Sequence, residues 1–260
     1  MTWQRVPLVT RVVLAAHSGR KGADVLALAG SSDWRRSALD KTGACIVRVL
    51  GSGIGASAVD PVWPTQTWEE LDDELSSALP GLGLVGAVLP RQPGRRRLSL
   101  LGQLTGTEVV VKLGAVDAEI RNEAEALALL ERNPLPGIAT PRPLGAGTIR
   151  GANGDADYLV TTSIAIRRQS AAIDEPLRTF EKDLSVRLAE LAPDSAASGS
   201  VPIHGDLTPW NLRRTPRGLA LFDWEAAGWG APGSDIANYR RACDDVRRPW
   251  SRRRPTPRAT

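Results

Sequence analysis

The sequence predicts an α+β protein, because a group of short β-like runs is followed by segments with helical periodicity. Three apolar runs, Leu84 to Leu89, Leu98 to Leu104 and Glu108 to Leu113, are separated by short turns rich in Gly, Pro and Thr, and they predict antiparallel strands. A helical pattern from about Asp117 to Arg132 follows, and Tyr158 to Thr162 then predicts another strand. We therefore expect a small β-rich lobe followed by a mainly helical one.

Four segments are expected along the chain. Residues 1–79 form an N-terminal extension of unknown role, which ends in a helix that Thr67 and Glu70 begin as a capping box. Residues 80–162 form the first lobe and 163–246 the second. Residues 247–260 are rich in Arg and Pro, a composition typical of a disordered tail.

Composition excludes several classes of protein. The net charge is only +4, and the arginines are spread along the chain with few aromatic residues between them, so a nucleic-acid-binding surface is not predicted. Two cysteines are too few for a disulfide framework. No run approaches the roughly 20 apolar residues of a membrane span. We expect a cytoplasmic protein with neither nucleic-acid nor membrane partners.

The segment from Val201 to Asn211 carries the first chemical signal. It places Asp206 and Asn211 five positions apart, directly after a short apolar run. Phosphoryl transfer needs a carboxylate that orients the attacking hydroxyl and accepts its proton, and a neutral oxygen ligand for Mg²⁺. Asp206 suits the catalytic role and Asn211 the metal-binding one. In the simpler interpretation, both residues only form turns and caps.

A second acidic segment follows this loop closely. The run Leu219 to Glu225 predicts a strand that ends on Asp223 and is joined to the first strand by a turn. A hairpin centred on Arg217 would place Asn211 and Asp223 directly opposite each other, with Cβ atoms about 4.5–5.5 Å apart. An amide oxygen and a carboxylate at that distance can share Mg²⁺.

Lys112 and Glu123 form a predicted ion pair. Lys112 ends an apolar strand, and Glu123 lies on the apolar stripe of the following helix, between Ile120 and Leu127. A carboxylate that faces a core is costly unless it is paired, and Lys112 is the nearest candidate cation. The alternative for Lys112 is a surface lysine whose stem packs on apolar side chains.

These motifs resemble those of the aminoglycoside phosphotransferase and choline kinase family. His204-Gly205-Asp206 with Asn211 is similar to the catalytic loop of that family, and Phe222-Asp223-Trp224-Glu225 is similar to its metal-binding segment. The resemblance implies a protein-kinase-like two-lobed fold, with ATP and Mg²⁺ as cofactors. It also implies that Lys112 binds the α and β phosphates.

Supporting roles follow from the same resemblance. Asp235 is similar to an aspartate that hydrogen-bonds the catalytic loop, although a helix N-cap is an alternative role. We expect His204 to brace the loop backbone, and Glu225 either to assist the metal or to support the loop. Backbone groups around Val160 to Thr162 would hold the adenine.

The position of the phosphate-covering loop stays open. The turn around Gly94 lies between the first two strands, where such a loop belongs, and is preferred. Gly81 to Gly86 matches a glycine-rich loop by its letters but lies far from Lys112 for a single hairpin.

The expected function is transfer of the ATP γ-phosphate to a hydroxyl of a small molecule, such as an aminoglycoside, an amino alcohol or a sugar-like compound. The second lobe is expected to be shortened, since few residues follow Asp223. The alternative is therefore a truncated nucleotide-binding relative with weak or no catalysis and a regulatory role. The sequence predicts neither the acceptor nor the oligomeric state.

Overall fold

A computed structural model describes part of the chain: residues 3–5, 12–15, 57–58, 64–65, 67–88, 96–116, 118–164, 170–172, 177, 179–191 and 198–247. Most of the predicted N-terminal extension, the turn that contains Gly94 and nearly all of the predicted tail lie outside these residues.

An eight-stranded antiparallel sheet dominates the first lobe, with the strand order β3-β1-β2-β4-β5-β6-β9-β8. The three predicted neighbouring strands are β4, β5 and β6, and the predicted strand at 158–162 is the second half of β9. The strands are β1 (Trp3–Arg5), β2 (Val12–Ala15), β3 (Ser57–Ala58), β4 (Leu82–Val88), β5 (Arg97–Leu104), β6 (Thr107–Ala115), β8 (Pro143–Ile149) and β9 (Ala156–Thr162).

Strand β8 was not predicted, because its sequence reads as a Pro-rich connection. Among the described strands it pairs with β9 alone, and it forms an edge of the sheet. Proline is tolerated at the start of an edge strand, where the missing N–H breaks no ladder. Gly147 fits here because a Cβ at this position would lie 2.9 Å from the Tyr158 hydroxyl.

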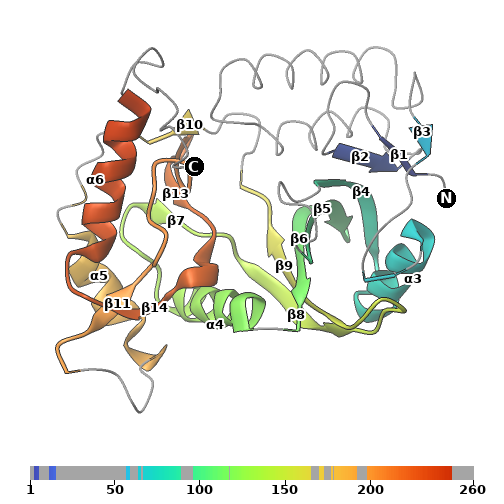
Figure 1. Cartoon of the computed structure of the whole chain (residues 1–260), viewed down its shortest axis with the longest axis horizontal. Helices are drawn as coiled ribbons and strands as arrows, with labels where there is room; N and C mark the ends of the chain where they lie inside the picture. Colours follow the sequence, from blue (N-terminus) through green and yellow to red (C-terminus); the bar gives the residue numbers. More distant parts are fainter. Residues whose placement is uncertain are drawn as a thin grey trace, which may run out of the picture.

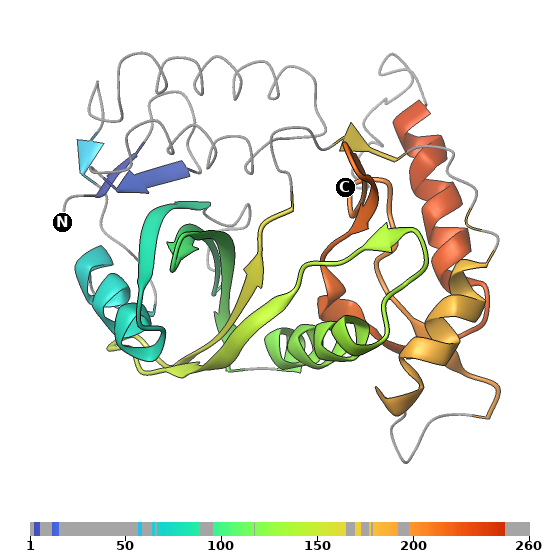
Figure 2. The ribbon, with the colours of Figure 1, turned by 180° about the vertical axis from the view of Figure 1, so that it is seen from behind.

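Helix α3 (Trp68–Ala78) covers one face of this sheet (Figure 2). The side chain of Thr67 caps it by accepting a hydrogen bond from the N–H of Glu70, which is one of the two hydrogen bonds of the predicted capping box. Trp68, Leu71 and Leu75 are buried against the sheet and belong to its hydrophobic core.

Helix α4 (Ala118–Arg132) connects the two lobes. It packs on β8 and β9 of the sheet and on the short helix η4 (Trp224–Ala226) of the second lobe. After α4 the chain forms β7 (Ile138–Ala139), which pairs in parallel with β13 (Gly218–Leu221) of the second lobe before the chain returns to the large sheet.

Small sheets lie beside helices in the second lobe, as Figure 1 shows, and its described residues form two such sheets. Its four-stranded sheet has the order β10-β12-β13-β7, and its two-stranded sheet consists of β11 and β14. The remaining elements are β10 (Ser170–Ala171), α5 (Phe180–Arg187), η3 (Ala189–Leu191), β11 (Val201–Ile203), β12 (Leu212–Thr215), β13 (Gly218–Leu221), β14 (Gly228–Gly230) and α6 (Ser234–Arg247).

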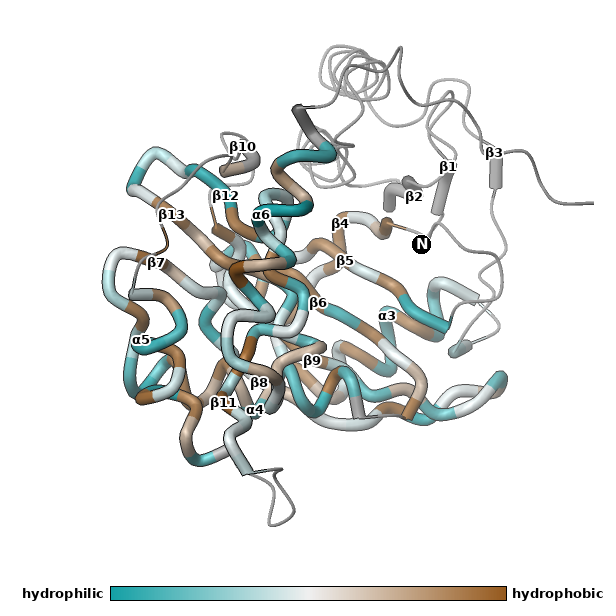
Figure 3. The backbone as a smooth tube through the Cα atoms, turned by 60° about the vertical axis from the view of Figure 1, so that its left-hand side comes forward, coloured by the Kyte–Doolittle hydropathy of each residue, from teal (hydrophilic) through white to brown (hydrophobic). Residues whose placement is uncertain are grey.

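Two separate clusters of buried side chains form the cores of the two lobes. One lies between α3 and the large sheet, and the other joins α4 to α5, α6 and the β12–β13 hairpin. Hydrophobic and hydrophilic stretches alternate along the elements of both lobes in Figure 3, as expected for elements with one buried face. The predicted α+β class with two lobes is thus confirmed. Among the described helices, none has the length and hydrophobicity needed to cross a membrane.

Candidate active site

Lys112 joins two carboxylates that come from different lobes. Its Nζ lies 2.7 Å from both carboxylate oxygens of Glu123 on α4, and 2.7 Å from Oδ1 of Asp223 at the end of the β12–β13 hairpin. The predicted Lys112–Glu123 contact is therefore present, and Asp223 completes it as a third member.

The local structure explains why these side chains meet. Alternate residues of a strand face opposite sides, so Lys112 points away from the core that contains Val111 and Leu113. On α4, Glu123 follows the buried Ile120 by three positions, and its side chain is only 2% exposed. A carboxylate this deeply buried requires a cation, and Lys112 supplies it.

The loop after β11 is held by Asp235 from α6. The two carboxylate oxygens of Asp235 accept hydrogen bonds from consecutive backbone N–H groups, that of His204 at 2.6 Å and that of Gly205 at 3.0 Å. This is the contact that the family resemblance implied. Asp235 is buried, so its carboxylate satisfies two buried donors at once.

His204 braces the loop from inside. One ring nitrogen lies 2.9 Å from the carbonyl oxygen of Phe222, and the other accepts the N–H of Asp206 at 3.2 Å. The ring is fully buried and makes an edge contact with Trp224. Burial lowers the pKa of His204 to about 4, despite the favourable contact with the Phe222 carbonyl. A neutral imidazole with one donor and one acceptor fits this arrangement.

Asp206 is exposed, beside Asn211. The amide nitrogen of Asn211 donates at 2.9 Å to the carbonyl oxygen of Asp206 and at 2.9 Å to its carboxylate. Partial burial raises the pKa of Asp206, and the charge of Asp223 adds to this, while hydrogen bonds from Asn211 and Asn238 oppose it. The result is an accessible, oriented carboxylate whose basicity is increased.

The predicted hairpin register is wrong by one residue. The strands pair Leu212 with Leu221 and Thr215 with Gly218, and the N–H of Phe222 donates to the carbonyl oxygen of Asn211 at 3.0 Å. Asn211 is therefore opposite Phe222. The turn consists of residues 216 and 217, so the hairpin is centred between them and not on Arg217 as predicted. Asp223 lies beyond the ladder with a positive φ of 65°.

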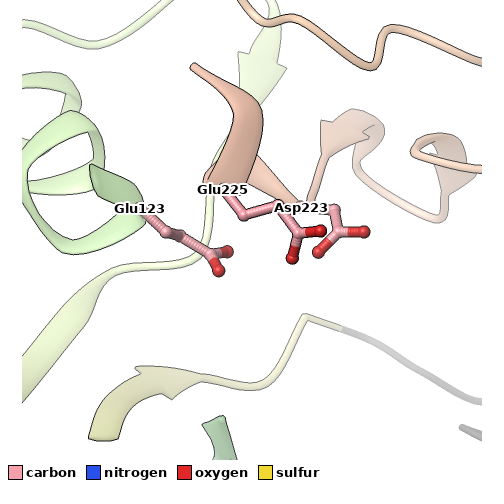
Figure 4. A group of neighbouring side chains, drawn as sticks. All are labelled: Glu123, Asp223 and Glu225. Carbon is pink, nitrogen blue, oxygen red and sulfur yellow. The ribbon is translucent and has the colours of Figure 1, made fainter. Parts of the chain in front are cut away.

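Three carboxylates lie close to one another, as Figure 4 shows. Glu123 extends from α4 toward Asp223 and Glu225, and one oxygen of each lies within 4.8 Å of the others. Lys112 and Arg97 outweigh the effect of burial on Asp223 and lower its pKa to about 2. A cluster of carboxylate oxygens of this kind fits a hard divalent cation such as Mg²⁺.

Arg97 is a site residue that the sequence analysis missed. It forms ion pairs with Glu225 and, at 3.2 Å, with Glu119. It stands among three consecutive arginines in the sequence, so nothing distinguished it from an ordinary surface cation. The one usable signal was strand alternation: Leu98 faces the core, so Arg97 faces the other side of the sheet, as Lys112 does.

The structure describes only some of the segments predicted to bind the nucleotide. Gly94 lies outside the described residues, so the phosphate-covering turn stays a prediction. Gly83 and Gly86, from the alternative loop, lie within β4. The segment 160–162, expected to hold adenine, is the end of β9, beside β6 and its Lys112.

Part of this chain is similar to a family of phosphotransferases. Residues 164–255 match the sequence profile of the APH family, described as the phosphotransferase enzyme family. The match covers the catalytic loop, the hairpin and α6. It confirms the resemblance predicted from the sequence and the enzyme class that the resemblance implied. No curated protein sequence matches this chain.

Solved structures of phosphotransferases show partial similarity. An aminoglycoside-3'-phosphotransferase of type VIII is 22% identical, with 66% of this chain and 82% of that chain covered and a TM-score of 0.42. A microcompartment-associated aminopropanol kinase is 13% identical, with 64% and 72% covered and a TM-score of 0.41. An amicoumacin kinase in complex with AMP-PNP and Ca²⁺ is 13% identical, with 66% and 68% covered and a TM-score of 0.39.

Proposed function

We propose that this chain is an ATP-dependent phosphotransferase that moves the γ-phosphate to a hydroxyl group of a small molecule. The observation that carries the proposal is the convergence of Lys112, Glu123 and Asp223 from two lobes beside a loop that presents Asp206. A lysine fixed between carboxylates is positioned to bind phosphate oxygens, and an exposed aspartate nearby can receive a hydroxyl proton.

Each residue has a stated role in this proposal. Lys112, held by Glu123, binds the phosphates. Asp206 orients the acceptor hydroxyl and accepts its proton, and Asn211 keeps the Asp206 carboxylate in place through its 2.9 Å hydrogen bond. His204 and Asp235 fix the backbone of the loop. Catalysis would come mainly from positioning and from stabilisation of charge.

Asp223, Glu225 and Asn211 are the residues that would hold Mg²⁺. The low pKa of Asp223, about 2, keeps its carboxylate ionised near neutral pH, as a metal ligand requires. Mg²⁺ bound there would neutralise negative charge on the phosphates. Lys112 already occupies one oxygen of Asp223, which leaves the other for the metal.

The test is Mg²⁺-dependent ADP release by the purified protein, measured against a panel of aminoglycosides, amino alcohols and sugars. Asp206→Ala is the matched variant, because Asp206 is exposed and its loss should leave the fold intact. Acceptor-stimulated release that disappears in the variant supports the proposal and identifies the acceptor class. ATP binding without turnover across the panel favours the alternative, a nucleotide-binding relative without catalysis.

A further inference from the structure

Arg97 lies on the same face of the sheet as Lys112. It is the first residue of β5 and pairs with Gly114 of β6, while Ser99, two residues further on, pairs with Lys112. Alternate residues share a face of a sheet, so the side chains of Arg97 and Lys112 emerge side by side. Arg97 also directly follows the 89–96 connection between β4 and β5, where a phosphate-covering turn is predicted.

The guanidinium of Arg97 is bound from two other elements. Nη1 lies 3.2 Å from Oε2 of Glu119 on α4, and Nη2 forms an ion pair with Glu225 on η4. The side chains of Arg97 and Glu225 are only 15% and 19% exposed. Like Lys112, Arg97 therefore crosses from the sheet to the acidic segment of the second lobe.

Each carboxylate of the site contacts a cation. Lys112 contacts Glu123 and Asp223, and Arg97 contacts Glu225, the third carboxylate of the group within 4.8 Å. A guanidinium binds phosphate through the same planar fork with which it binds a carboxylate. Exchange of Glu225 for a phosphate would leave the charge of Arg97 compensated, and Glu225 available to a cation.

We propose that Arg97 is a second phosphate-binding residue, which exchanges its ion pair with Glu225 for the terminal phosphates of a nucleoside triphosphate as Glu225 turns toward the accompanying cation. This inference rests on the proposed function, since it assumes that a nucleoside triphosphate binds beside Lys112. It gives Arg97 a role in binding and Glu225 a role as its exchange partner.

The first experiment compares ATP and adenosine binding to the full chain by calorimetry with Mg²⁺ present. Arg97→Ala should weaken ATP binding about tenfold or more, the loss expected for a charge-assisted contact, and should change adenosine binding less than about twofold. Arg97→Lys should restore part of the ATP affinity. Arg132→Ala is the control, because Arg132 makes a mostly exposed ion pair with Glu190 outside the site.

The second experiment isolates the exchange by measuring ATP binding in EDTA. Glu225→Gln should strengthen it about threefold or more, because Arg97 then loses its ion pair with Glu225 and keeps the one with Glu119. The gain should disappear in the double variant Arg97→Ala/Glu225→Gln. Thermal unfolding of every variant verifies that it is folded.

Three results would overturn the inference: equal loss of ATP and adenosine affinity in Arg97→Ala, unchanged ATP affinity in that variant, or a gain that persists in the double variant. If any of these results is found and the wild-type protein still binds ATP and turns it over, the proposed function is unaffected. Wild-type protein that binds no nucleoside triphosphate overturns both.

Discussion

Lys112 and Asp223 are 111 positions apart in the sequence, yet the lysine Nζ lies 2.7 Å from Oδ1 of the aspartate. The lysine belongs to the large sheet and the aspartate to the hairpin of the second lobe. This ion pair therefore forms only when the two lobes pack on α4 together.

Replacement of Lys112 should destabilise the fold as well as abolish phosphate binding. Lys112→Met leaves Glu123, which is 2% exposed, without its cation, and loss of one partner of a buried pair costs about 3–5 kcal/mol. Lys112→Met/Glu123→Leu should recover most of the free energy of unfolding, which urea denaturation measures. Arg132→Ala, in an exposed pair, should cost less than about 1 kcal/mol. If Lys112→Met and Arg132→Ala lowered the free energy of unfolding equally, Lys112 would not be the cation that stabilises the buried Glu123.

His204 should make stability depend on pH. Its pKa in the folded protein is lowered to about 4 from an ordinary value of 6.5, so the unfolded chain binds the proton more tightly. Its contribution is complete above about pH 6.5 and is lost as the pH falls toward 4, by about 3 kcal/mol in total. His204→Gln should flatten this part of the curve in urea titrations at several pH values. An unchanged curve in the variant would assign the pH dependence to another group.

Gly205 should not tolerate a side chain. Its φ is +82°, and a Cβ would lie 2.1 Å from the carbonyl oxygen of Ala226. Gly205→Ala should therefore cost more than about 3 kcal/mol. Gly199 has a similar φ of +86° but open space around it, so Gly199→Ala should show only the backbone strain of about 1–2 kcal/mol. Denaturation midpoints of the two variants separate the steric effect from the strain.

The pH–rate profile should report on Asp206. Partial burial raises its pKa. Only the carboxylate form can take the proton of the acceptor hydroxyl, so kcat/KM should fall as the pH drops through this raised pKa. Asn238→Ala removes a hydrogen bond that favours the carboxylate, so the acidic limb should move to higher pH. Asp206→Asn should lower the rate about 10²–10⁴-fold at every pH. An acidic limb that stays in place in Asn238→Ala would assign it to another group.

Local patterns predicted the elements that carry the site. Periodicity placed Glu123 on the buried face of α4, and Glu119 and Glu125 are exposed as the helix phase requires. The capping box at Thr67 and the strands β4, β5 and β6 follow equally local rules. Strand β8 escaped these rules because Pro143 and its glycines disfavour a strand, and it is stabilised by non-local contacts, namely its pairing with β9 and its packing against α4.

The sequence by itself determined the motifs, their order and the pairing of Lys112 with Glu123, because one buried carboxylate needs a nearby cation. The tertiary structure decided which other groups reach them. It moved Asn211 opposite Phe222 through a two-residue turn, and it brought Asp223 onto Lys112. It also drew Arg97 to Glu225 across the lobes. Such contacts depend on the register of strands and the packing of lobes, which residues far apart in the chain fix together.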